Sequence, residues 1–238
     1  PHELSQRTRL PRIQGTLRCT GEHELIVDLA SLAAHEPVES MQGAVHWVNH
    51  LLFNPSGERF IFLHRWRRED QRRWTTRFYT AKRDGSDRHL FTVDRASHFI
   101  WRDDEHILLW ASTDEFGPAY YLLTDKTYIA TPVAKEWLHR DGHCTYSPDG
   151  KWILTDAYPD ANRMRPLYLY NVERDELVEV ASFYSPKESN VEWRCDLHPR
   201  WSRDGRWVCV DSSHEGLRQV YLVDVSDIVG SSATMRVF

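Results

Sequence analysis

A short segment recurs along the chain about every 50 residues, and this repeat constrains the fold more than any other feature. Three regular copies contain an aromatic residue, Ser or Asn, two further residues and a glycine, followed by an apolar run; their glycines are Gly57, Gly150 and Gly205. In a fourth, altered copy Asp104 takes the place of the glycine. The spacings of 47, 46 and 55 residues are typical of propeller blades.

Each repeat contains short β-rich runs bounded by turn residues, such as KWILTDAY, PLYLYNVE and ELVEVASFY after Gly150. The sequence therefore predicts an all-β fold, a single β-propeller domain with four visible four-stranded blades. The predicted blades cover residues 49–95, 96–138, 139–185 and 194–238. Residues 1–48 are expected to add N-terminal strands or a partial blade through IQGTLRCT and HELIVDLAS, although residues 25–36 also show a helical period. A native ring of six or seven blades would make this chain a fragment, which the missing initial Met also favours.

The composition excludes several classes of protein. With 238 residues, 41% hydrophobic and 27% charged, the chain is an ordinary globular one, and its net charge of -5 argues against a general nucleic-acid binder. No apolar run reaches the roughly 18 residues of a membrane span, and the N-terminus lacks a signal sequence, so the cytoplasm is the default location. The four cysteines show no CxxC pairing. Four recurring tryptophans are expected in the core between blades: Trp101, Trp152, Trp201 and Trp207.

A histidine stands seven residues before the turn glycine in each regular copy, at His50, His143 and His198. The first strand of each blade lines the channel of a propeller, so these side chains are expected to converge at one mouth of it. Neutral imidazole suits Mn, Fe, Ni and Zn, and three imidazoles around one axis predict a transition-metal site. The alternative is a solvated or hydrogen-bonded structural role for each histidine.

Arginines are expected around the same mouth and are the candidate substrate-binding residues: Arg65, Arg67, Arg163 and Arg200. Guanidinium forks bind carboxylates bidentately, so a small acidic saccharide fits better than a neutral sugar. The alternative is that these arginines are solvated or paired with neighbouring acidic residues.

The segments YSPDGKWILTD and WSRDGRWVCVDS resemble TolB-type propeller repeats, and SHFIW, HCTYSPDG and CDLHPRWSRDG followed by DSSHEG resemble the oligogalacturonate lyase family. The resemblance covers about residues 46–225. It implies β-elimination on pectin-derived oligogalacturonate, with manganese held by histidines and a glutamine at blade starts and a histidine as base. By repeat position it implies that His143 and His198 hold the metal, with Zn, Fe or Ni as other candidate ions, and that His98 is the base.

The last ligand cluster of that family has the form Gln-x-x-His-Pro-His, whereas this chain has CDLHPR. Cys195 thus stands at the glutamine and Arg200 at the second histidine. His50 could replace one ligand, Asp196 could supply an oxygen, and Cys195 would be a soft ligand that favours zinc. Either the metal is held differently here or the lyase chemistry has been lost.

Other functions stay open at this stage. A non-catalytic TolB-like propeller that binds protein, peptide or acidic saccharide explains the fold and the arginines, and it predicts a metal-free protein. The propeller of a serine peptidase carries similar repeats, but the chain has no GxSxG motif. A hydrolase with a metal-bound water cannot be separated from a lyase by sequence, and a homo-oligomer could complete the ring.

Overall fold

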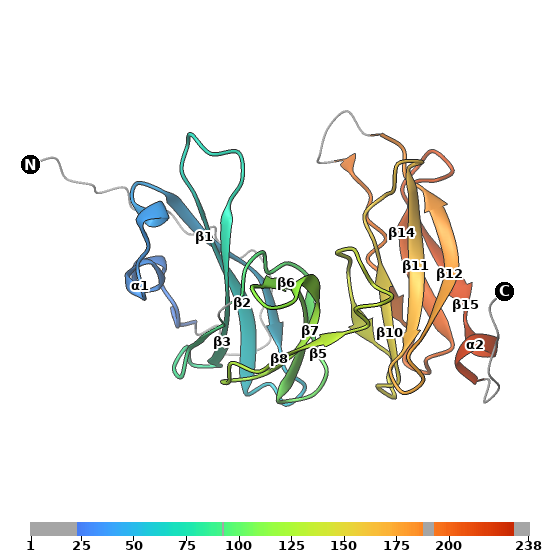
Figure 1. Ribbon diagram of the computed structural model, residues 1–238, viewed down its shortest axis with the longest axis horizontal. Coiled ribbons are helices and arrows are strands. Elements are labelled where there is room, and N and C mark those ends of the chain that lie inside the picture. Colours follow the sequence, from blue (N-terminus) through green and yellow to red (C-terminus); the bar gives the residue numbers. More distant parts are fainter. Residues whose placement is uncertain (1–22, 92, 188–192, 231–238) are drawn as a thin grey trace, which may run out of the picture.

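A computed structural model describes residues 23–91, 93–187 and 193–230 and shows four antiparallel sheets in chain order (Figure 1). The first sheet contains β1 (Val45–Phe53), β2 (Arg59–Arg67), β3 (Thr75–Lys82) and β4 (His89–Phe91). The second contains β5 (Phe99–Trp101), β6 (His106–Thr113), β7 (Gly117–Thr124) and β8 (Ala130–Val133). The third contains β9 (Thr145–Tyr146), β10 (Trp152–Asp156), β11 (Met164–Asn171) and β12 (Glu176–Tyr184). The fourth contains β13 (Arg200–Trp201), β14 (Trp207–Ser212) and β15 (Gln219–Asp224).

The sheets are the blades of a β-propeller, which confirms the fold expected from the repeat. In each blade the strands follow one another in chain order, so the first strand of every blade occupies the same edge. The described helical elements are short: α1 (Leu29–Ala34), the 3-10 turn η1 (Glu39–Met41) and α2 (Ser226–Gly230). None of these helices has the length and apolar character needed to cross a bilayer.

The N-terminal segment differs from the expectation. The run HELIVDLAS at residues 23–31 forms no strand; instead Asp28 caps α1 by accepting a hydrogen bond from the Ser31 amide at 2.8 Å. The local helical period therefore prevails over the β-branched run here. The other predicted strand, IQGTLRCT, lies outside the described residues.

Apolar side chains between neighbouring blades form the core. Strand alternation gives β2 two buried faces: Ile61 and Leu63 pack with the second blade, whereas Phe60 and Phe62 pack with Leu32 of α1. Two further clusters join the second blade to the third and the third to the fourth. Within the described residues no cluster joins the fourth blade to the first, and these blades lie at opposite ends of the molecule in Figure 1.

The expected tryptophan core is correct for Trp101, Trp152 and Trp201 and wrong for Trp207. Trp101 and Trp152 are each 5% exposed between blades, and the half-buried Trp201 packs against the cluster of blades three and four. Trp207 is 40% exposed. Its strand position matches the repeat, but none of the described residues forms a blade on that side.

Candidate functional site

Four histidines line one open pocket of about 280 Å³. They are His50 on β1, His98 before β5, His143 before β9 and His198 before β13. The remaining lining residues come from the same four first strands or their starts, so the pocket lies where the inner edges of the blades meet. Repeat position thus brought these four side chains to one place; their roles stay a prediction.

The backbone at two of these positions is unusual. His50 has φ 54° and His198 has φ 44°, in the left-handed region that non-glycine residues rarely adopt. At His50 the pairing of β1 with β2 shifts register between Asn49 and Leu52. Such irregularities re-aim a side chain and occur often beside functional sites, and here the re-aimed side chains line the pocket.

His143 is held by a buried carboxylate. Asp156, 1% exposed at the end of β10, accepts hydrogen bonds from the His143 backbone amide at 2.6 Å and from its Nδ1 at 3.1 Å. Burial alone would raise the pKa of Asp156, but the hydrogen bonds from His143 and the nearby Arg165 lower it below its ordinary value. Gly142 permits this contact, because a Cβ there would lie 1.7 Å from the Asp156 carbonyl oxygen. With Nδ1 donating to a carboxylate, Nε2 of His143 is left as a lone-pair donor.

His98 has the same kind of partner. Its Nδ1 lies 2.8 Å from Oδ1 of Asp141, and its ring centroid lies 4.1 Å from that of His143. The Asp141 carboxylate fixes the tautomer of His98 with the proton on Nδ1, so that Nε2 can accept a proton. This arrangement suits a general base placed beside a metal ligand.

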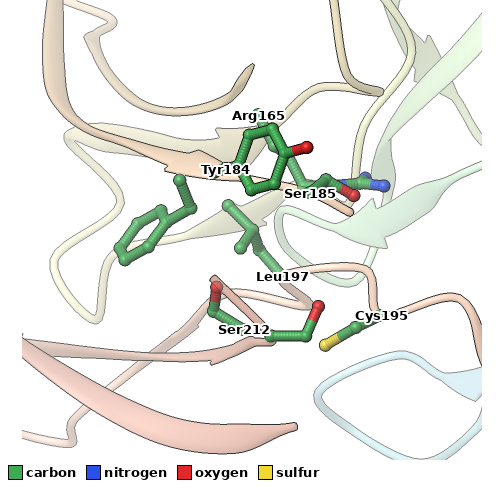
Figure 2. A pocket seen from close by; sticks show the side chains of 8 residues that line it. Arg165, Tyr184, Ser185, Cys195, Leu197 and Ser212 are labelled. Atoms are coloured by element: carbon green, nitrogen blue, oxygen red, sulfur yellow. The ribbon is translucent and has the colours of Figure 1, made fainter. Parts of the chain in front are cut away.

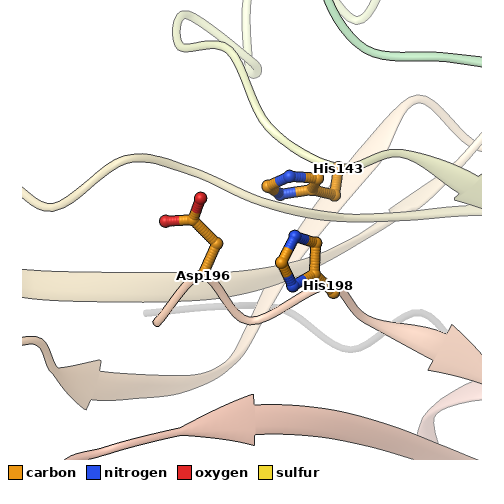
Figure 3. Close-up of side chains that lie close together, drawn as sticks. All are labelled: His143, Asp196 and His198. Carbon is orange, nitrogen blue, oxygen red and sulfur yellow. The ribbon is translucent and has the colours of Figure 1, made fainter. Parts of the chain in front are cut away.

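His143, Asp196 and His198 form a cluster whose ligand atoms all lie within 4.8 Å of one another (Figure 3). The imidazole rings of His143 and His198 have centroids 4.3 Å apart. Two nitrogens and one carboxylate oxygen are a donor set that suits Mn, Fe or Zn, so these residues fit a transition-metal ion. However, Asp196 also forms ion pairs at 2.8 Å with Arg165 and with Arg194, which compete with a metal for its oxygens.

Two imidazoles of the pocket have a lowered pKa, which favours their neutral form. Burial lowers the pKa of His198, and the adjacent His143 lowers it further. Burial also lowers the pKa of His50, followed by the charge of Arg65 and by two neighbouring histidines. Neutral imidazole is the form that binds metals and accepts protons.

The predicted substrate-binding arginines do not gather at one point. Arg200 lines the histidine pocket, and Arg65 lies near enough to His50 for its charge to act on that ring. Arg67 is exposed at the end of β2. Arg163 donates to the carbonyl oxygens of Ser185 and Pro186 at 2.8 and 2.9 Å and is not among the pocket residues.

Cys195 belongs to a different cavity. It lines a narrow space with Arg165, Leu197 and Ser212 (Figure 2) and is not among the residues that line the histidine pocket. Burial raises the pKa of its thiol, which disfavours the thiolate that a metal would need.

The carboxylates that contact the histidines were missed from the sequence, although the repeat contains a signal for each of them. Asp156 and Asp211 each stand six residues after the turn glycine of a repeat that carries a histidine seven residues before it. Oδ2 of Asp211 lies 3.6 Å from Nδ1 of His198, as Asp156 lies beside His143. Asp141 also has a counterpart, because it stands two residues before His143 as Asp196 stands two residues before His198.

No protein-family model and no curated protein matches the chain. Among solved structures, an oligogalacturonate lyase from Vibrio parahaemolyticus is similar, with 17% identity, a TM-score of 0.58 and coverage of 75% of this chain and 49% of the lyase. An acylaminoacyl peptidase from Pyrococcus horikoshii matches with 11% identity, a TM-score of 0.50 and coverage of 76% and 31%. TolB from Acinetobacter baumannii matches with 20% identity, a TM-score of 0.47 and coverage of 82% and 42%. The chain spans about half the length of the lyase, and its similarity to the lyase and to the peptidase shows the fold alone.

Proposed function

We propose that the protein is a metal-dependent lyase that cleaves oligogalacturonate or a related uronate oligosaccharide by β-elimination. The observation that carries this proposal is the pocket itself: His98 with its Asp141 partner stands 4.1 Å, ring to ring, from His143 of the candidate metal cluster. A base and a cation site side by side are what the removal of a proton next to a carboxylate requires.

The residues of the chain have separate tasks in this reaction. His143 and His198, with Asp196 or His50, would hold a divalent ion, for which manganese is our first candidate. That ion, when bound, would supply a Lewis acid that neutralises the uronate carboxylate. Nε2 of His98 takes the proton from the carbon next to the carboxylate, and the C–H electrons form the new double bond as the neighbouring C–O bond breaks. Asp141 stabilises the imidazolium that results, and the departing oxygen takes a proton from solvent.

A binding module is the second candidate. The specific observation in its favour is that Asp196 is already neutralised by two arginines and that Arg200 occupies the pocket. Such a module would bind an acidic saccharide, protein or peptide at the same mouth without turnover.

The experiment is an ultraviolet assay for unsaturated uronate products with trigalacturonate, run with added Mn²⁺ and with EDTA. The lyase proposal expects product that depends on the metal and on His98. Tight binding of the saccharide without any product, at every metal tested, would favour the binding module.

A further inference from the structure

Arg65 is a buried arginine without an acidic partner among the residues that the structure describes. It is 9% exposed, its Nε is buried without a hydrogen-bond partner, and no ion pair involves it. Other buried arginines are compensated: Arg59, at the opposite end of the same strand, pairs with Asp87 and Asp125. A buried charge without a partner is costly, so a negative group supplied by a ligand would stabilise it.

Arg65 lies close enough to the histidine pocket for its charge to act on His50. Alternation along β2 places it on the same face as Ile61 and Leu63, which pack on the second blade. Arg65 pairs with Trp47 across the sheet, and its guanidinium carbon lies 5.5 Å from the ring centroid of Trp74. The indole holds the guanidinium by a cation–π contact and limits the directions in which the fork can bind.

Trp74 offers an aromatic surface beside this charge. Arg65 lies over its ring, and 52% of the residue is still exposed. Trp47 meets it edge-on, with centroids 6.3 Å apart, and so fixes the indole in place. The exposed indole of Trp74 and the guanidinium of Arg65 together suit a ligand ring that has an apolar face and carries a carboxylate.

We propose that Arg65 and Trp74 form a carboxylate subsite beside the histidine pocket, which binds a second acidic sugar ring of the ligand. Arg65 takes the carboxylate and Trp74 packs against the ring. The proposal rests on the proposed function in taking the ligand to be an acidic oligosaccharide, but it needs neither bound metal nor turnover.

The test is a calorimetric titration with trigalacturonate and with its full methyl ester, in EDTA so that binding is measured apart from metal and catalysis. The parent should bind the acid about tenfold more tightly than the ester, because the ester lacks the charge-assisted contact with Arg65. Arg65→Met should lose most of this preference and bind the acid about tenfold more weakly. Trp74→Ala should weaken the acid and the ester alike. Arg83→Met is the matched control, because Arg83 is an exposed arginine at the other end of the same blade, and it should bind as the parent does.

Removing an unpaired buried charge should leave the unfolding temperature of Arg65→Met unchanged or higher, so loss of binding cannot be attributed to unfolding. Arg65→Lys, which keeps the charge and loses the fork, should show an intermediate affinity. Equal affinity of the parent for acid and ester, or unchanged affinity in Arg65→Met, would overturn the subsite. Failure of the lyase proposal would leave a different signature: no unsaturated product, with the Arg65-dependent preference for the acid still present.

Discussion

At the scale of single residues, the account depends on pairs of imidazole and carboxylate rather than on histidines alone. His98 and His143 each donate Nδ1 to an aspartate, which leaves Nε2 of one ring to accept a proton and that of the other to bind a cation. The two rings are close together, yet their partners come from different parts of the chain. Each aspartate can therefore be changed separately.

Replacing His98 with alanine should lower turnover about 10²- to 10⁴-fold, the range typical of losing a general base. The metal content of the variant should equal that of the parent, because His98 is outside the metal cluster. Elemental analysis and the ultraviolet assay on the same preparation check both expectations. Parallel loss of metal and activity would show that His98 is a ligand instead.

Replacing Asp156 with asparagine should weaken metal binding about 10- to 100-fold, since the carboxylate orients His143 and raises its basicity. Asp114→Asn, at an exposed turn, is the matched control and should bind as the parent does. A metal titration followed by calorimetry compares the three proteins. An Asp156 variant with parental affinity would mean that His143 does not bind the ion through Nε2.

At the scale of secondary-structure elements, β2 connects the site to the N-terminal segment. One face of the strand carries Arg65, whose charge acts on His50 of the pocket, and the other carries His64, which is fully buried and hydrogen-bonded to His46 at 2.9 Å. Burial first, and then the charges of His46 and Arg77, lower the pKa of His64 to about 4. The packing of α1 and β1 against this face therefore requires a neutral His64.

This requirement predicts an acid-sensitive stability. Above the unfolded pKa of about 6.5, His64 is neutral in both states and the full stability is present. As the pH falls from there to about 4, the unfolded chain binds a proton that the folded chain does not, which costs about 2–3 kcal/mol of unfolding free energy. Urea unfolding of the parent and of His64→Gln across this range measures the effect as a difference. The same pH slope in both proteins would contradict it.

The sequence predicted an element well where turn residues mark its ends, and poorly where no turn residue does so. The repeat glycines at Gly57, Gly150 and Gly205 have φ between 70° and 74° and mark the turn between the first two strands of their blades. Residues 23–31 lack such a turn signal, and their hydrophobic run suited a strand or a helix equally well. The register shift at His50 also has no local sequence signal, because it depends on how β1 meets β2.

At the scale of the whole molecule, the described residues fill three blade interfaces but leave the outer face of the fourth blade exposed. Leu154 is fully buried between the third and fourth blades, whereas Leu222 on β15 is 69% exposed. The first blade has no such bare face, since Leu32 of α1 covers it. The repeat predicts the blades and their order, but the covering of the two ends follows from tertiary contacts that no repeat position specifies.

This difference predicts unequal costs for the same substitution. Leu154→Ala should destabilise the protein by about 2–5 kcal/mol through the cavity that it leaves. Leu222→Ala should change the stability by less than about 0.5 kcal/mol, as expected for a surface position. Denaturant unfolding of both variants gives the comparison. A cost at Leu222 as large as that at Leu154 would mean that the fourth blade is covered in solution.

The site was predicted in part, because the blades carry their histidines at equivalent positions of the repeat. The three regular copies carry His50, His143 and His198, the altered copy carries His98, and all four side chains line one pocket. The arginines were less predictable: loop position placed Arg163 at the mouth, whereas its guanidinium binds two backbone carbonyls. The hydrogen-bond partners of a loop side chain depend on the conformation of the loop, which the repeat does not specify.

The most direct test of the central claim is the metal content of the purified protein, compared with that of a His143→Ala, His198→Ala double variant after exposure to Mn²⁺ at neutral pH. The account predicts about one equivalent of transition metal in the parent and none in the variant, with both proteins folded. Metal-free parent protein, or equal metal in the two, would contradict a metal site in the histidine pocket and with it the proposed lyase chemistry.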